Sequence, residues 1–332
     1  MSASPSSNSS GVQTVVIQPS RGWMSVDFGE IWRYRELFGF LVWRDIKVKY
    51  KQTLLGFAWA IIGPLANTFI FTILFGRLGK LPTDGLPPAV FYMIGLVLWR
   101  YFSQSLTMTS NSLVGNQALL TKIYVPRLIL PTTPLLTGLV DFLIAFAVLI
   151  LVMFYFHTIP AVTILLTPFL ILITMGTAMG MGLFFAALNV RYRDVRQLVP
   201  FLIQLWMYAT IIIPFSKLPE RWGNWRYLYG LNPMGGAVEA FRWCLAHHKM
   251  VSVKVVESTI PSLPDKLAST QKVIVEPLAN QTLLLTLQER LLSPPAPFPW
   301  LLVAIGLGSM TLMLLIGLWA FKRMERQFAD IV

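Results

Sequence analysis

The chain has 332 residues, of which 55% are hydrophobic and 13% are charged, and its formal net charge is +12 at pH 7. Soluble domains average about 25% charged residues, and one core of this size could not bury so much apolar surface, so the composition excludes an ordinary soluble protein. The single cysteine excludes an intrachain disulfide, and together with the three histidines it makes no metal-binding constellation (Cys244, His157, His247 and His248).

Residues 1–29 are expected to form a disordered cytoplasmic tail, because the chain begins with a Ser-rich stretch that has no apolar period. The first fifty residues lack the short apolar core of a signal peptide, so we expect no cleavage. Residues 30–52 then mix aromatic, aliphatic and basic side chains, with Phe38, Leu41 and Trp43 near one face. This pattern favours an amphipathic helix in the cytoplasmic interface over the alternative of a simple positive anchor.

Six apolar blocks follow, each about 20 residues long, the length that crosses the hydrocarbon core of a bilayer. They are predicted at residues 54–75, 89–108, 133–156, 162–188, 198–215 and 300–321. Several contain Pro or Gly, which neighbouring helices make tolerable inside a membrane. The predicted fold class is therefore an all-α integral membrane protein with about six transmembrane helices.

The positions of Lys and Arg predict the orientation, because cytoplasmic loops carry an excess of positive charge. The short loops on one side offer only Arg77 and Lys80. The basic loops and tails on the other side contain Arg21, Arg33, Arg35, Arg44, Lys47, Lys49, Lys51, Lys122, Arg127, Arg191, Arg193, Arg196, Lys322, Arg323 and Arg326. Both termini, including the tail at 322–332, are predicted to be cytoplasmic, and the long segment at 216–299 external. The positive charge then reflects topology and attraction to anionic lipids, and nucleic-acid binding is not expected.

The loop after the second span is moderately apolar, although it is too polar to span. A short helix at about 112–121 would present Leu113, Leu119 and Leu120 to a partner protein. The alternative is that these side chains fold back onto the bundle, and the sequence leaves the two possibilities open.

The external segment divides into two parts. Residues 219–248 concentrate aromatic side chains, which favour the membrane interface and also stack on sugar rings. They include Trp222, Trp225, Tyr227 and Tyr229. Residues 249–297 are polar and Pro-rich and are interpreted as a small insertion.

Two charges fall inside predicted spans, namely Arg100 in the second and Asp141 in the third. A lone charge at such depth costs at least about 2.5–3.5 kcal/mol on insertion scales, so each should pair or face water. One hypothesis is an Arg100–Asp141 ion pair between the two helices. A rival hypothesis is that Arg100 faces a translocation channel and meets an anionic linker or glycan hydroxyls, and a third is that both charges reach polar surroundings separately.

Motifs for catalysis are absent from the sequence. There is no G-x-x-x-x-G-K-[ST] phosphate loop, and the GRLGK run at 76–80 lacks its spacing. The acids and histidines lie too far apart in sequence to suggest a hydrolase or transferase triad. We therefore expect no catalytic residue, no metal and no cofactor on this chain.

Five segments form an ordered set of motifs: LVWRDIKVKYKQTLLGFAWAIIGPL (41–65), LLTKIYVPRLILP (119–131), LNVRYRDVRQLVPFLIQLWMYAT (188–210), LNPMGGAVEAFRWCL (231–245) and RMERQFADIV (323–332). Together they resemble the ABC-2 permeases that export lipid-linked polysaccharides such as O-antigen, capsule or teichoic acid. The resemblance spans most of residues 30–248 and 300–332, whereas the stretch at 249–297 looks longer than the family usually has.

The resemblance implies a multi-pass protein of the bacterial inner membrane that works as a homodimer with two copies of a separate ATPase, which binds ATP and Mg. The interfacial helix would line the cytoplasmic entrance, with Arg44, Lys47, Lys49 and Tyr50. The loop at 112–122 would couple to the ATPase through Leu113, Leu119, Leu120 and Lys122. An external helical hairpin at about 219–248 would close the far end of the channel, with Trp222, Trp225, Tyr227 and Tyr229 as gate candidates beside Arg100 as a channel candidate.

Two other classes remain open at this point. The first is an ABC-2 permease for a drug or another hydrophobic small molecule. The second is a membrane-embedded enzyme or an ion-coupled transporter, which would carry several acids or histidines within its spans, and this sequence has almost none.

Overall fold

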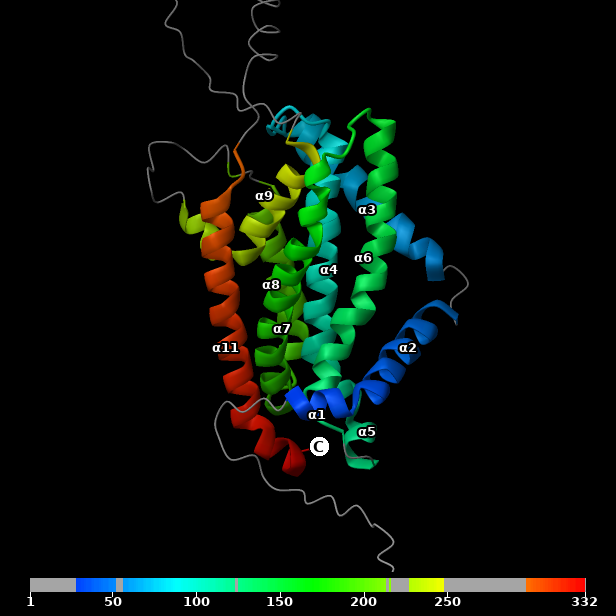
Figure 1. Ribbon diagram of the computed structural model, residues 1–332, viewed down its shortest axis with the longest axis vertical. Helices are drawn as coiled ribbons and strands as arrows, with labels where there is room; N and C mark the ends of the chain where they lie inside the picture. The colour runs from blue at the N-terminus through cyan, green and yellow to red at the C-terminus, as the bar shows by residue number, and fades with distance from the viewer. Residues whose placement is uncertain are drawn as a thin grey trace, which may run out of the picture.

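A computed structural model describes residues 28–51, 56–122, 125–212, 215, 227–247 and 297–331. All regular secondary structure in these residues is helical, and the long helices form one elongated bundle (Figure 1). The predicted N-terminal tail, up to residue 27, and the insertion at 249–296 lie outside the described residues, so their predictions stay untested.

The helices follow one another in nearly the predicted order. The N-terminal pair is α1 (Phe28–Arg33) and α2 (Arg35–Lys51), where one interfacial helix was predicted. The long helices and their extensions are α3 (Gly56–Phe71) with a π-helix (Thr72–Leu78), α4 (Pro88–Gly115), α6 (Ile129–Tyr155), a 3-10 turn (Val162–Leu166) with α7 (Thr167–Arg191), α8 (Val195–Ile211) and α11 (Trp300–Ile331). The shorter helices are α5 (Gln117–Lys122) and α9 (Pro233–Ala246).

Four of the six predicted spans are long and apolar enough to cross a membrane: Ala58–Leu78, Ile129–Tyr155, Val162–Arg191 and Trp300–Met324. The other two correspond to α4 and α8. At 17 residues α8 is short for a span. The 28-residue α4 is long enough but contains many polar side chains. Both helices nonetheless run alongside the four apolar ones in the bundle (Figure 1).

The position of α4 explains its composition. It contacts α3, α6, α7, α8 and α9, so neighbouring helices rather than lipid cover most of its surface. Its first half, from Val90 to Trp99, is buried on all sides. A helix enclosed in this way can carry polar side chains, because neighbouring protein groups offer them the hydrogen-bond partners that hydrocarbon lacks.

The helix α9 lies within the segment at 219–248 for which an external helical hairpin was predicted. It packs against α4, α7, α8 and α11, and nearly all of its side chains are buried. Its start is capped by Asn232, whose side chain accepts a hydrogen bond from the Met234 amide at 3.1 Å. The aromatic residue Phe241 is fully buried in the core rather than placed at a surface. A chain segment that leaves α8 therefore folds back into the bundle.

A buried arginine fixes α9 in this position. Arg242 pairs with Glu239 at 2.8 Å and donates to the carbonyl oxygen of Ile211 at the end of α8, at 3.0 Å. Its guanidinium also lies 3.9 Å from the centre of the Phe91 ring on α4. One side chain thus links α9 to both α4 and α8, and no periodic pattern in the sequence indicated this contact.

The helices α7 and α11 touch through their backbones. A Cβ atom on Gly317 would lie 1.9 Å from the carbonyl oxygen of Gly180, and a Cβ atom on Gly180 would lie 2.6 Å from the amide nitrogen of Leu314. Small residues are what permit such close approach between helices in membranes. These two glycines therefore set the packing of the last helix.

We predict that Gly317→Ala destabilises the protein, because the methyl group can be accommodated only if the two helices move apart. Overpacking of this kind costs about 1–3 kcal/mol or more. Thermal unfolding in detergent should show a lower midpoint for this variant. Gly308→Ala is the matched control, since no atom lies within 4 Å of a Cβ atom at that position of the same helix. Equal midpoints for the two variants would contradict the packing.

Candidate functional site

Polar side chains form a stripe along one face of α4. They occur at spacings of three and four residues, which places them on the same side of a helix. The stripe consists of Arg100, Ser103, Gln104, Thr107 and Asn111. Of these, sequence reasoning identified only Arg100. The helical spacing of Ser103, Gln104, Thr107 and Asn111 could have indicated the stripe from the sequence. It was missed because most of these residues fall within the long block that was interpreted as apolar.

A groove of about 510 Å³ lies against the upper part of this stripe, between α3, α4 and α8. Asn67 on α3 and Gln204 on α8 contribute amide side chains, and both are exposed. The remaining lining residues are Leu96, Trp99, Arg100, Ser103, Gln104, Thr107, Met108, Pro200, Ile203 and Met207. The groove is therefore rich in neutral hydrogen-bonding groups and has one cation.

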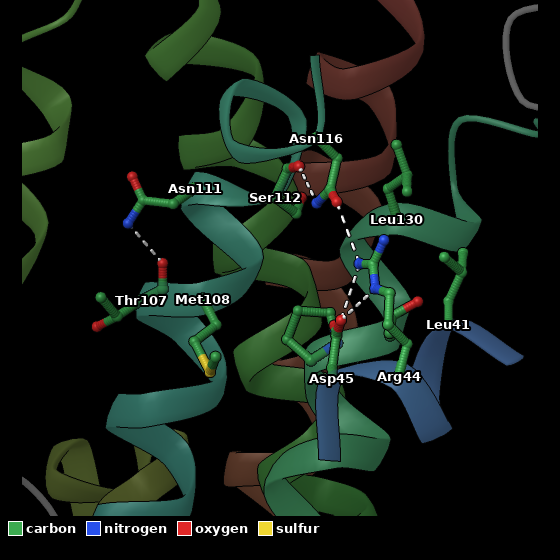
Figure 2. A pocket seen from close by; sticks show the side chains of 11 residues that line it. Leu41, Arg44, Asp45, Thr107, Met108, Asn111, Ser112, Asn116 and Leu130 are labelled. Atoms are coloured by element: carbon green, nitrogen blue, oxygen red, sulfur yellow. Dashed lines mark hydrogen bonds and ion pairs between the residues drawn. The ribbon is translucent and has the colours of Figure 1, made fainter. Parts of the chain in front are cut away.

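A second cavity of about 230 Å³ lies against the lower part of the stripe, between α2, α4 and α6 (Figure 2). Thr107 and Met108 line both cavities, so the two adjoin along α4. Arg44 and Asp45 of α2 line this second cavity, and Asn111 of α4 is also among its lining residues. The polar surface thus continues to the end of the bundle where α1, α2 and α5 gather (Figure 1).

Arg44 connects α2 to the junction between α4 and α5. Its guanidinium pairs with the neighbouring Asp45 at 2.8 Å and donates to the side-chain oxygen of Asn116 at 3.3 Å, as Figure 2 shows. Asn116 ends α4, and its amide donates to the carbonyl oxygen of Ser112 at 2.9 Å. A displacement of α5 would therefore reach α2 through this contact.

Asp141 joins α2, α4 and α6. Its carboxylate forms an ion pair with Lys49 and accepts hydrogen bonds from the Tyr50 hydroxyl and, at 2.7 Å, from the Gln104 amide. Burial is the main cause that raises the pKa of Tyr50 above its ordinary value, and the hydrogen bond from Tyr50 to Asp141 is the second. The phenol therefore stays protonated and donates. The partner of Asp141 is thus Lys49, and the hypothesis of an Arg100–Asp141 ion pair is wrong. The interfacial helix reaches deeper beside α6 than the sequence suggested and brings a cation of its own.

Arg100 lies against α3 instead. Gly63 faces it so closely that a Cβ atom there would lie 2.4 Å from an Nη atom of the guanidinium. Among the described residues Arg100 makes no ion pair, and its side chain lines the groove.

The other predicted site residues are distributed differently. Leu113 is buried in the core of its own bundle, and Leu119 is half-buried against the same cluster. Lys47 is exposed on α2. Tyr229 donates from its hydroxyl to the carbonyl oxygen of Thr210 at 2.9 Å, and Tyr227 lies beside Phe215. The side chains of Leu120, Lys122, Trp222 and Trp225 lie outside the described residues.

The described part of the chain has no group of three or more His, Cys, Asp or Glu side chains that could hold a metal ion. What the polar face can provide is binding through hydrogen bonds along its length and a single unpaired cation near its upper end.

We predict that Lys49 and Asp141 are energetically coupled, whereas Arg100 and Asp141 are not. A double-mutant cycle with Lys49→Met and Asp141→Asn should give a coupling of about 0.5–3 kcal/mol in the free energy of unfolding, measured by SDS titration in micelles. The matched cycle with Arg100→Met and Asp141→Asn should be additive to within about 0.5 kcal/mol. Coupling confined to the arginine cycle would refute this arrangement.

The comparison with known proteins bears on this site. Residues 36–246, which include α9 and all but the first residue of α2, match the family model described as ABC-2 type transporter. The chain is 27% identical over 223 residues to the O-antigen export system permease protein RfbA of Myxococcus xanthus, covering 67% of this chain and 84% of that protein. It is 26% identical over 201 residues to RfbA of Klebsiella pneumoniae, covering 60% and 76%. It is 27% identical over 208 residues to the polysialic acid transport protein KpsM of Escherichia coli, covering 60% and 77%. The family match spans more than half of the chain, and the protein therefore belongs to the ABC-2 type transporter family.

Proposed function

We propose that this chain is the permease subunit of an ABC exporter that moves a polysaccharide out across the bacterial inner membrane. The names of the similar proteins from three bacteria refer to O-antigen export and polysialic acid transport. Four helices are of membrane-spanning length and composition, which agrees with a multi-pass inner-membrane protein. The chain has no phosphate loop, so a separate ATPase subunit binds ATP and Mg and supplies the energy.

The observation that carries this proposal is the polar groove beside α4. Amides from Asn67, Gln104 and Gln204 suit the hydroxyl groups of sugars, which both donate and accept hydrogen bonds. Sites for drugs and other apolar molecules are instead lined mainly by hydrophobic and aromatic side chains with few polar groups. Half of the residues that line the groove are apolar, and the hydrogen-bonding side chains of the other half are what supports a glycan over the alternative substrate, a hydrophobic small molecule.

In the proposed topology, six helices span the membrane and both termini are cytoplasmic. Figure 1 places α1, α2, α5 and the C-terminal end of α11 at one end of the bundle. The arginines of the α7–α8 connection belong to the same set of basic loops, which favours the cytoplasm for this end (Arg191, Arg193 and Arg196). The spans added to the four apolar ones are α4, which the bundle encloses, and α8, which packs against α4, α7 and α9.

The proposed mechanism is mechanical. Two copies of the chain form the channel and two ATPase copies bind beneath them, with α5 as the coupling helix. Movement of α5 displaces Asn116, which holds Arg44 of α2. Through Lys49 and Tyr50, α2 in turn holds Asp141 of α6 at the side of the polar stripe. Closure of the ATPase could thus change the width of the polar path without any catalytic residue on this chain.

We predict that the purified chain hydrolyses no ATP, and that a complex with its ATPase does so faster when the cognate polysaccharide is present. Cells that lack the chain should retain the glycan inside, and expression of the chain should restore it to the surface. Turnover by the chain alone would refute the division of labour. Stimulation by hydrophobic drugs, with none by glycans, would favour the alternative substrate.

A labelling experiment tests topology and coupling together, and Ala118 on α5 and Arg77 on the π-helix, both exposed, suit it. In a Cys244→Ala background, an impermeant maleimide should label Arg77→Cys only from outside and Ala118→Cys only from the cytoplasmic side. Bound ATPase should protect Ala118→Cys and leave Arg77→Cys unchanged. Labelling of both cysteines from the same side would refute the topology, and absence of protection would refute the coupling role of α5.

A further inference from the structure

Arg100 is the one feature of the polar face that neither packing nor pairing explains. It lies near the middle of the 28-residue α4, roughly 20 Å from either end at about 1.5 Å per residue. The acid that could have neutralised it, Asp141, is bound by Lys49 and Tyr50. A lone charge in the middle of a spanning helix is costly, so it must face water or a polar ligand.

The surroundings of Arg100 are those of a binding site rather than of a buried pair. The residues that line its groove include no Asp or Glu, so no carboxylate there competes for the guanidinium. Asn67 and Gln204 are exposed on the two flanking helices and can donate further hydrogen bonds. By contrast Arg242, the buried arginine of α9, has an acid, a carbonyl oxygen and an aromatic ring as partners.

Gly63 gives Arg100 a defined position. Its missing side chain leaves room for the guanidinium on the surface of α3, where a Cβ atom would lie 2.4–3.0 Å from three guanidinium atoms. The positive group is thus held at the wall of the groove between α3 and α4. A fixed guanidinium with free N–H groups is suited to bidentate contact with an oxyanion.

We propose that Arg100, seated on Gly63 and flanked by Asn67 and Gln204, forms a subsite for an oxyanionic group of the transported molecule. This inference rests on the proposed function. An oxyanion can come from two sources, namely the diphosphate that links a glycan to its lipid carrier or the carboxylates of an acidic glycan. The neutral groups from Ser103 to Asn111 continue the path for uncharged sugar units.

Binding to the full chain in complex with its ATPase, in nanodiscs of neutral phosphatidylcholine, tests the subsite. The probes are radiolabelled farnesyl diphosphate for the linker and an oligomer of sialic acid for the acidic glycan, with farnesol and a neutral oligomannose as uncharged counterparts. We expect saturable binding of at least one anionic probe and much weaker binding of its counterpart. The probe that binds identifies the source of the oxyanion.

Two substitutions examine the arginine in independent ways. Arg100→Gln should weaken binding of the anionic probe at least about tenfold, because a bidentate charged contact is lost. Gly63→Ala keeps the charge but displaces the guanidinium, so it should weaken binding several-fold. The controls are Arg77→Gln, which removes a cation at the end of the π-helix, and Gly308→Ala, which adds a methyl group in open space, and both should bind within about twofold of the parent.

Unchanged binding in both Arg100→Gln and Gly63→Ala would overturn the subsite. It would also be overturned if neither of the two anionic probes bound to the parent protein. If Arg100→Gln fails to fold, binding of the anionic probe to Gly63→Ala and to Arg100→Lys tests the subsite instead, because both variants retain the positive charge. Weaker binding in these variants would support the subsite, and unchanged binding would overturn it. The proposed function fails separately. Arg100-dependent binding without glycan-stimulated ATP hydrolysis or export would refute the function and leave the subsite. Normal export, together with binding of the anionic probe that is unchanged in Arg100→Gln, would refute the subsite alone.

Discussion

Five neighbouring helices pack around α4, the helix that carries the polar stripe. Polar side chains in a hydrocarbon environment must be satisfied by protein or by water. The helices α3, α6, α7, α8 and α9 pack around α4, and its polar stripe lines the two cavities between α4 and its neighbours. Ser103, Thr107 and Asn111 are also hydrogen-bonded to carbonyl oxygens of α4 itself, so the helix satisfies part of its own polar stripe.

The interfacial helix is bound into this arrangement by charge. Lys49 neutralises Asp141, and Arg44 reaches Asn116 at the end of α4. Ion pairs at exposed surfaces contribute little, but Asp141 is largely buried, with 10% of its side chain exposed, so losing its partner would leave a charge with few alternatives. The helix α2 therefore connects the junction of α4 and α5 to the polar face.

At the opposite end of the bundle, Arg242 and Glu239 show how the same chain handles a charge that has a structural role. This pair is enclosed by α4, α8 and α9 and has hydrogen-bond partners for most of its polar atoms, although Arg242 Nε has none. Arg100 lacks such partners in the described residues and faces a groove. The contrast between two arginines in one bundle separates an arginine that holds helices together from one that is available to a ligand.

The membrane class, the approximate helix boundaries and the family were predictable from the amino-acid sequence, because long apolar blocks and ordered motifs are local properties of the chain. The sequence also indicated that Arg100 and Asp141 needed partners. Only the tertiary structure decided which partners they have, since Lys49 lies 92 residues from Asp141 and reaches it through the path of α2 beside α6. The burial of Leu113 and of α9 was likewise decided by packing. An apolar or aromatic residue suits lipid, a partner and a core equally well, and only the helices around it determine which of the three it meets.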